Sequence, residues 1–346
     1  HIGLFSLLLL VLGVGVVTWL GGHLHRPLMV SEPRTFEVES GQGLSRILLE
    51  LQREGALGED GEARIRHFSA RLYDLFTGVS QRIHVGEYRL APDDTLLALL
   101  NRLERGEVVQ RTFTLVEGWN IRELRQALAE TPGLQPLTLE WDDNRLMAEL
   151  GKPAMHPEGW FAPDTYFYVR GDTDLALLER ALARQQQLLE QIWLQRQEAL
   201  PLNSAYEALI LASIIEKETG VPEERPAIGG VFVSRLKIGM RLQTDPTVIY
   251  GMGADYDGNI RRRDLRTPTP YNTYVISGLP PTPIAMPGAE ALLAAVQPDE
   301  TGALYFVARG DGSHVFSETL EQHEAAVRQY QLQRRSDYRS SPGGSQ

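Results

Sequence analysis

Two glutamates, Glu216 and Glu218, end an apolar run with the sequence Leu211-Ala-Ser-Ile-Ile-Glu-Lys-Glu-Thr219. The run predicts a helix, on which residues two apart lie about 200° from each other, so the two carboxylates cannot serve one pocket. Glu218 shares the apolar side with the isoleucines three and four residues before it. Apolar surroundings and the helix C-terminus both favour its neutral form, which can protonate a glycosidic oxygen. The alternative is a solvated pair of surface glutamates.

A loop rich in hydrogen-bonding side chains follows about twenty residues later, with the sequence Met240-Arg-Leu-Gln-Thr-Asp-Pro-Thr-Val-Ile-Tyr-Gly251. Further long loops dense in Pro, Gly, Asn and Thr cover residues 267–274 and 278–288. Long loops inside a compact domain are usually functional. One acid beside such loops indicates chemistry on a polar, uncharged polymer such as a sugar chain.

Composition excludes several classes of function. The chain has 346 residues, which allows two folded domains, and a net charge of −11, which would repel nucleic acid. It has no cysteine, which excludes disulfides, thiolate metal sites and cysteine nucleophiles. The stretch Asp255–Asn259 resembles the start of a calcium loop, but Ile260 stands where glycine is needed, so a surface turn is the better interpretation. The sequence therefore predicts no metal site and no cofactor.

The N-terminal segment is apolar. Residues 2–22 are 21 residues without a charge, enough at about 1.5 Å per residue to cross a bilayer core of roughly 30 Å. A cleaved signal peptide would have a shorter apolar region and an A-x-A-like site. We therefore expect a retained transmembrane helix over residues 1–22 and a linker over residues 23–32. Arg26 weakly opposes the positive-inside pattern, but an exported body is preferred.

The spacing of apolar residues after position 31 predicts an α+β fold with a small domain over residues 33–110. Thr35–Gly41 alternates like a half-buried strand and precedes a helical pattern that begins at Leu44, and similar units begin at Tyr88 and Thr112. The first and third share Thr-Phe-x-[Val/Leu]-x-x-Gly. Small carbohydrate-binding modules of the LysM type use the same order of strand, turn and helix. A generic α+β domain without a ligand is the alternative.

Residues 111–335 are expected to form one larger α+β domain. Helical patterns cover residues 175–194, 206–219 and 231–238. Gly220 and Pro222 predict where the second helix stops, because glycine tolerates a left-handed cap and proline cannot continue the helix. The polar, Gly/Ser-rich residues 336–346 are predicted to be a disordered tail.

Four motifs carry a family resemblance: the two quoted above, Tyr271-Asn-Thr-Tyr274 and Glu158-Gly-Trp-Phe-Ala-Pro-Asp-Thr165. Together they resemble the YceG-like family of endolytic murein transglycosylases, from the apolar N-terminus to about His323. The departures are small: Thr282 stands where glycine is expected, and Pro226 lies early in a helix. The resemblance implies that Glu218 is the catalytic acid.

The resemblance also implies a mechanism. The acid protonates the oxygen that links MurNAc to GlcNAc, then as a base removes a proton from the MurNAc C6 hydroxyl, which closes a 1,6-anhydro ring. We expect a set of polar loop residues to line the cleft and hold N-acetyl and hydroxyl groups: Gln243, Thr244, Asp245, Tyr250, Asn272 and Tyr274. Each could instead serve only loop structure. Trp160, Phe161 and Tyr166 could stack on sugar rings or fill the core.

Partners and location follow from the same resemblance. Peptidoglycan glycan strands are the implied substrate, and cell-wall synthases are implied partners. The implied place is the cell inner (cytoplasmic) membrane, crossed once, with the body on the periplasmic or outer side.

Two other classes of function stay open. One is a non-catalytic, membrane-tethered peptidoglycan-binding scaffold, in which Glu218 is dispensable. The other is a hydrolytic muramidase, which needs a second carboxylate near Glu218, and Asp245 is the candidate.

Overall fold

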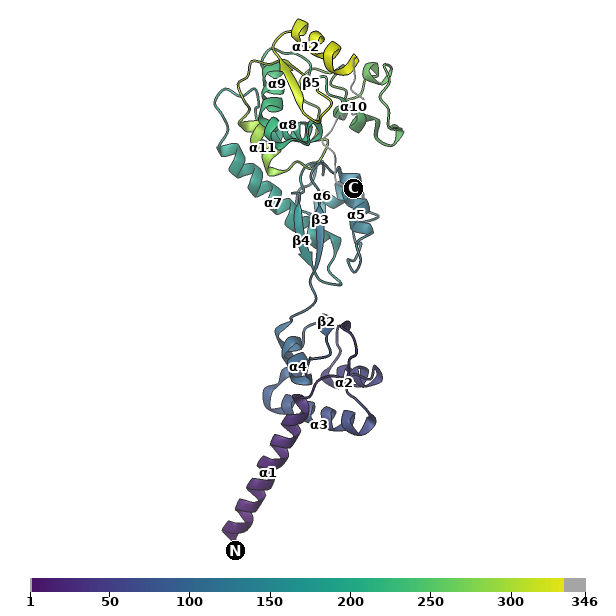
Figure 1. The fold of residues 1–346 in the computed structure, drawn as a ribbon, viewed down its shortest axis with the longest axis vertical. Helices are drawn as coiled ribbons and strands as arrows, with labels where there is room; N and C mark the ends of the chain where they lie inside the picture. The colour runs from purple at the N-terminus through teal and green to yellow at the C-terminus, as the bar shows by residue number, and fades with distance from the viewer. Residues whose placement is uncertain (1, 333–346) are drawn as a thin grey trace. The chain divides into compact units, whose positions relative to one another are not determined.

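The computed structural model describes residues 2–332, except for the side chains of residues 2–10 and 12. The predicted tail over residues 336–346 lies outside the described residues. The fold is α+β, as expected, with helices joined to short two-stranded sheets (Figure 1). The chain divides into two compact units. Unit 1 is His1–Thr112 with Phe167–Asp172, and unit 2 is Phe113–Tyr166 with Thr173–Gln346.

Two successive stretches have the same order of strand, helix, helix, strand and helix. The first contains β1 (Arg34–Val38), α2 (Leu44–Arg53), α3 (Asp60–Thr77), the short 3-10 helix η1 (Val79–Arg82), β2 (Gly86–Leu90) and α4 (Leu96–Arg105). The second contains β3 (Arg111–Leu115), α5 (Ile121–Ala129), α6 (Asp143–Glu149), β4 (Asp164–Tyr168) and α7 (Asp174–Leu194). The strands of each stretch pair with each other, β1 antiparallel to β2 and β3 beside β4.

Matching side chains support the two stretches as an internal repeat. The Tyr88 hydroxyl of β2 donates to the carbonyl four residues earlier at 2.7 Å, and the Tyr166 hydroxyl of β4 does the same at 2.6 Å. Thr95 caps α4 and Thr173 caps α7, each accepting from the N–H three residues on. The shared strand motif noticed in the sequence therefore belongs to a longer repeated pattern.

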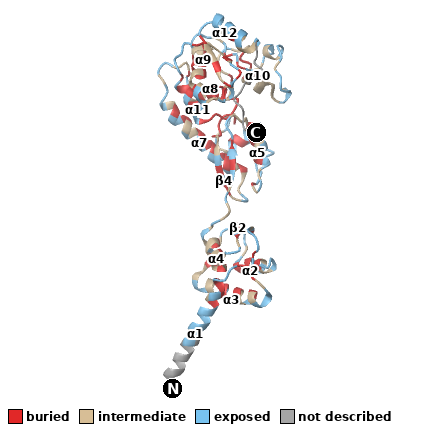
Figure 2. Ribbon diagram, in the orientation of Figure 1, coloured by how far each residue is buried: buried red, intermediate tan, exposed pale blue. Residues whose placement is uncertain are grey.

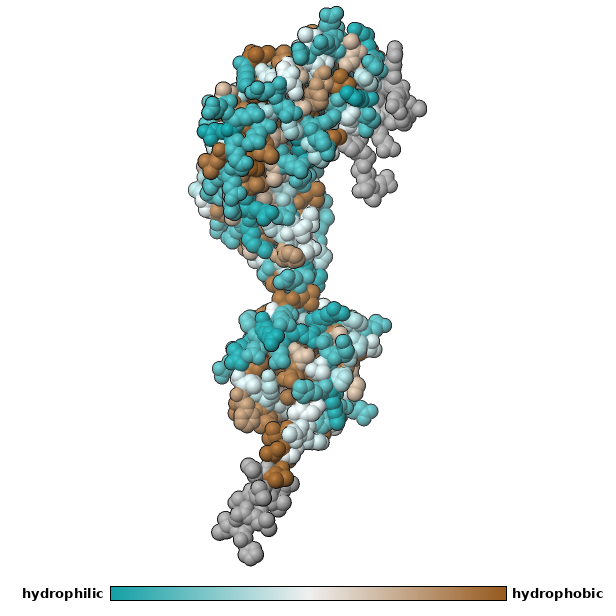
Figure 3. Space-filling model, turned by 60° about the vertical axis from the view of Figure 1, so that its left-hand side comes forward, coloured by the Kyte–Doolittle hydropathy of each residue, from teal (hydrophilic) through white to brown (hydrophobic). Residues whose placement is uncertain are grey.

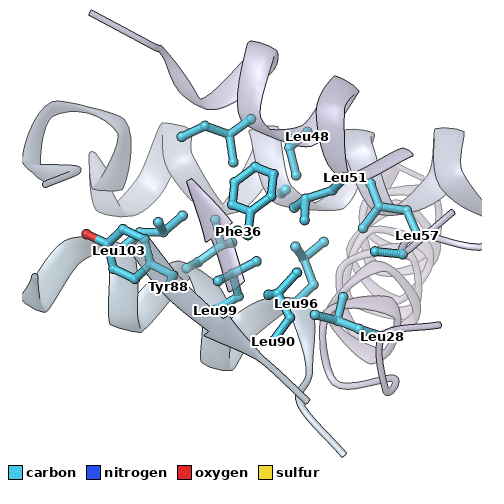
Figure 4. Packing of buried hydrophobic residues seen from close by; sticks show 14 of the residues in the cluster. Leu28, Phe36, Leu48, Leu51, Leu57, Tyr88, Leu90, Leu96, Leu99 and Leu103 are labelled. Atoms are coloured by element: carbon cyan, nitrogen blue, oxygen red, sulfur yellow. The ribbon is translucent and has the colours of Figure 1, made fainter. Parts of the chain in front are cut away.

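One hydrophobic core holds unit 1 together. The leucines of α2 and α4 pack there against Phe36 and Tyr88 of the paired strands (Figure 4). The segment expected to be a linker also takes part, because Leu28 and Val30 are buried in the same cluster. Pro27 forms a bridge with Thr95. Residues 24–30 are thus part of the folded unit.

The first helix, α1 (Ile2–Leu24), covers the predicted membrane span. Among the residues described with their side chains, no helix is long and apolar enough to cross a membrane. The predicted span over residues 1–22 falls in part on residues 1–10 and 12, whose side chains lie outside that set.

Unit 2 is built around α8 (Ala205–Glu218), whose residues 208–215 are all buried (Figure 2). It packs against α7, against α9 (Arg225–Lys237) and against α11 (Ala289–Val296). The remaining elements are η2 (Pro222–Glu224), α10 (Asp245–Met252), η3 (Gly253–Asp255), η4 (Asp264–Arg266), β5 (Tyr305–Ala308), β6 (His314–Ser317), α12 (Leu320–Val327) and η5 (Arg328–Leu332). β5 and β6 form an antiparallel hairpin.

Helix α8 stops by a different route from the one predicted. Its C-cap is Thr219 in an extended conformation, with φ −140°. Gly220 is not among the residues with positive φ, so no left-handed glycine cap forms. The prediction of that cap was wrong, although the helix ends where the sequence placed it. Pro226 fits without strain because it lies in the first turn of α9.

Two glycines let α9 approach its neighbours closely. A Cβ on Gly230 would lie 2.2 Å from the Asp299 carbonyl oxygen, and one on Gly229 would lie 2.5 Å from the Ala294 oxygen. We therefore expect Gly230→Ala to lower the free energy of unfolding of unit 2 by about 2 kcal/mol, because the clash outweighs the gain in helix propensity. Urea denaturation followed by tryptophan fluorescence measures this. The exposed Lys237→Ala in the same helix should stay within about 0.5 kcal/mol of wild type, and an equally small change for Gly230→Ala would contradict the packing.

Candidate active site

Glu218, at the last position of α8, is half-buried and keeps one edge on a cavity. Burial raises its carboxyl pKa to about 7. The negative charge of Asp245 acts in the same direction, while a hydrogen bond from Thr244 and the charge of Arg235 act against it. Near neutral pH both the protonated and the ionised forms of Glu218 are therefore populated. A group that first donates a proton and then accepts one needs both forms.

Thr244 connects Glu218 to the polar loops. It is the N-cap residue of α10, but its hydroxyl donates to Glu218 Oε1 and makes no capping bond. Its own N–H donates to Thr273 Oγ1 at 3.0 Å, and its carbonyl accepts from Thr247 Oγ1 at 2.8 Å. All three threonines are buried. The network fixes the Glu218 carboxyl and joins two motifs that are separated in the sequence.

A cavity of about 550 Å³ opens beside Glu218. Three predicted binding residues line it: Gln243, Asp245 and Tyr274. The Tyr274 hydroxyl donates to Asp245 Oδ1 at 2.6 Å. Gln243 is exposed and has a φ of +51°, which is uncommon for a residue other than glycine and is a feature that clusters at ligand sites. These residues place an amide, a phenol hydroxyl and one carboxylate, that of Asp245, around the acid.

Besides Thr244, two other predicted binding residues do not line this cavity. Tyr250 donates its hydroxyl to Glu158 Oε2 at 2.9 Å. The Asn272 amide is buried and holds its loop, donating to the carbonyls of Asp264 at 3.0 Å and Thr267 at 2.8 Å. Both residues therefore support the loops.

The three aromatic residues considered for sugar stacking, Trp160, Phe161 and Tyr166, are at most 8% exposed. The Trp160 ring stacks on Tyr206 with centroids 5.8 Å apart. These three residues therefore fill the core and do not form a stacking surface for sugar rings.

Glu158 is a buried carboxyl whose role the sequence did not predict. Both of its oxygens accept from the Ile121 N–H at the start of α5, at 3.1 and 3.2 Å. Burial raises its pKa to about 7. It joins the first turn of α5 to Tyr250 of α10, so the motif that begins at Glu158 positions the loop that carries Thr244.

Sequence reasoning also missed Arg235, Tyr305 and His323, which line the cavity. Arg235 is only 6% exposed and donates to the Leu304 carbonyl at 2.7 Å. In the described part of the chain no carboxylate lies within ion-pair distance of it. Its guanidinium lies 5.5 Å from the Tyr305 ring, which stacks on His323 with centroids 5.1 Å apart. No local motif marks these residues, since they come from α9, β5 and α12.

Glu216 does not share the cavity with Glu218, as the spacing of the two glutamates predicted, and the structure gives it a structural role. Its side chain is 6% exposed, lies 3.2 Å from the Arg225 guanidinium and accepts from the Gly288 N–H at 3.0 Å. Arg225 also pairs with Glu290 and, at 3.5 Å, with Glu117. The cluster ties α8, α9 and the start of α11 together.

Known proteins match this chain over most of its length. The chain belongs to the YceG-like family, which matches residues 36–329. An endolytic murein transglycosylase of Bacillus subtilis (strain 168) is 32% identical over 275 residues, covering 75% of this chain and 76% of that protein. One of the same name from Streptococcus pneumoniae (strain D39) is 26% identical over 282 residues, and the match covers 72% of this chain and about half, 51%, of the pneumococcal protein.

A solved structure agrees with the fold. The crystal structure of a YceG-like protein from Listeria monocytogenes matches with a TM-score of 0.53 and 29% identity. The match covers 86% of this chain and 99% of the Listeria chain.

Proposed function

We propose that this protein is an endolytic peptidoglycan lytic transglycosylase, which cleaves the MurNAc–GlcNAc bond within glycan strands and leaves 1,6-anhydro-MurNAc ends. The observation that carries the proposal is Glu218, a carboxyl with a pKa of about 7 on the edge of a polar cavity. Family membership and two relatives named endolytic murein transglycosylase support it.

In the proposed reaction the protonated Glu218 donates to the bridging oxygen as the bond from MurNAc C1 breaks, and GlcNAc leaves as an alcohol. The Glu218 carboxylate then accepts the proton of the C6 hydroxyl while O6 bonds to C1, which restores the acid. Because the nucleophile belongs to the same sugar, its high effective molarity takes the place of an activated water. The Thr244 hydroxyl and the Arg235 charge stabilise the carboxylate between the two steps.

We also propose that α1 anchors the protein by a single pass in the cytoplasmic membrane, with the body outside the cytoplasm. The uncharged residues 2–22 support this. Residues 33–110 would act as a LysM-like module that binds glycan or spaces unit 2 from the membrane, and cell-wall synthases are the expected partners.

A hydrolytic muramidase is the second candidate, because Asp245 lines the same cavity as Glu218. A hydrolase would need Asp245 to activate water or to form a covalent intermediate. Its Asp245→Asn variant would then lose about 100-fold or more of the activity at every pH. The transglycosylase proposal expects Asp245→Asn to keep making anhydro ends, with an altered pH profile.

The expected pH profile follows from Glu218. The first step needs the protonated acid, so activity should fall as the pH rises through about 7. Asp245→Asn removes a charge that raises the Glu218 pKa, so its fall should begin at lower pH. Thr244→Val removes a hydrogen bond that lowers the pKa, so its fall should begin at higher pH. The release of anhydro ends between pH 5 and 9 measures the pH profiles of both variants. If the two profiles shift in the same direction, Glu218 is not the acid that sets them.

A further inference from the structure

The outward face of α3 in unit 1 exposes large apolar side chains. Phe68, Leu75 and Phe76 are 60%, 78% and 78% exposed, and their spacing places them along one side of the helix. The opposite side faces the core and carries the buried residues Ala63, Arg66, Ser69 and Ala70. A surface helix usually turns its large apolar side chains toward the core. In α3 several of them lie on the solvent side instead.

Cations share that face with the apolar groups. Arg64 and Arg71 are exposed, lie one helical turn from Phe68 on either side, and form no ion pair within the part of the chain that is described. The two aspartates at the edges of the face are engaged, since Asp74 accepts from the Ser80 N–H at 2.7 Å and Asp60 from the Gln52 side chain at 3.4 Å. Phe and Leu are the apolar residues that interfacial helices place in the lipid, and an arginine beside them can lay its stem along the apolar surface while its charged head reaches the headgroups.

The position of α3 indicates which surface covers this face. Helix α1 packs on α3. The segment just after α1 is tied to α3 by an ion pair from Arg26 to Glu62 at 3.5 Å and by a hydrogen bond from Arg66 to the Pro27 carbonyl at 3.1 Å. Figure 1 shows α1 leaving unit 1 beside α3, and Figure 3 shows hydrophobic surface of this unit next to the emerging helix. Trp19, an interface-preferring residue, is 54% exposed in the last turns of α1.

We propose that α3 lies in the headgroup region of the membrane into which α1 inserts, with its apolar side chains among the lipid chains and its two arginines on the phosphates of anionic lipids. This inference rests on the proposed anchoring by α1. Attachment at two places fixes the tilt of unit 1 on the bilayer, which a single flexible tether would leave free. The folded segment over residues 24–30 fits this role, because it leaves no slack between α1 and the core.

The test uses the absence of cysteine in the chain. The full chain carrying Leu75→Cys is labelled with the fluorophore NBD and reconstituted into vesicles of phosphatidylethanolamine and phosphatidylglycerol. The matched control is Leu49→Cys on α2, an exposed leucine of the same unit. We expect the probe at position 75 to be quenched at least twofold more by lipids with a doxyl group on the chain than the probe at position 49, and iodide to show the opposite order.

Other outcomes are decisive. If the chain floats with vesicles but the probe at position 75 behaves like that at position 49, this inference fails and the anchor stands. If the chain does not float at all, the proposed anchor fails too. Disulfide-linked dimers of the unlabelled Leu75→Cys protein after mild oxidation, together with no lipid quenching of the labelled protein, would assign the face to a second copy. Arg64→Gln with Arg71→Gln should reduce the quenching in phosphatidylglycerol vesicles, and an unchanged value would remove the anionic lipid from the proposal.

Discussion

Glu218→Gln is expected to lower the release of anhydro-MurNAc ends from purified peptidoglycan by about 1000-fold. Glutamine has nearly the same shape and can still accept a hydrogen bond from the Thr244 hydroxyl, but its amide has no acidic proton to transfer and cannot act as a base. One substitution therefore removes both proton transfers of the proposed reaction. The variant should also be at least as stable as wild type, because burial disfavours the charge that it deletes.

The matched control is Glu223→Gln, an exposed glutamate a few residues later in η2. It should keep wild-type activity. A folded Glu218→Gln protein with more than about a tenth of the wild-type rate would show that another group supplies the proton. Unchanged function in cells with the variant would favour the non-catalytic scaffold.

Arg225→Met is expected to lower the free energy of unfolding by about 3 kcal/mol, because removing one partner of a buried ion pair leaves the other charge unpaired. The Arg225 side chain is 9% exposed, and the substitution leaves the nearly buried Glu216 without its cation. Urea denaturation measures the loss.

The control for that experiment is Arg309→Met, an exposed arginine of unit 2 that should change stability by less than about 0.5 kcal/mol. A loss below 1 kcal/mol for Arg225→Met would mean that the cluster does not join α8 to α9. The two variants report on the two glutamates of α8. Glu218→Gln should lose activity and keep its stability, whereas Arg225→Met, which removes the partner of Glu216, should lose stability.

The sequence predicted those parts of the fold and site that depend on local spacing. The helical period separated Glu216 from Glu218, and the structure puts one in an ion-pair cluster and the other at a cavity. It did not predict that Tyr250 bonds to Glu158 or that Asn272 holds a loop, because a polar side chain has the same identity whether it faces a substrate or a neighbour.

Pairing between distant segments accounts for the other differences. Tyr88 was expected to begin a separate unit, but β2 closes the sheet that β1 opens, with Phe36 opposite Tyr88. Arg235, Tyr305 and His323 meet at the cavity only through the packing of three elements. No periodic pattern in one segment reports such contacts.

The central claim is tested most directly by digesting purified peptidoglycan in water enriched in ¹⁸O and reading the new glycan ends by mass spectrometry. The proposed mechanism closes the ring with the sugar's own C6 oxygen. It therefore predicts anhydro-MurNAc ends without ¹⁸O, and none from the Glu218→Gln protein. Reducing ends that carry one ¹⁸O atom would mean that water is the nucleophile, and they would contradict the account in favour of a muramidase that uses Asp245.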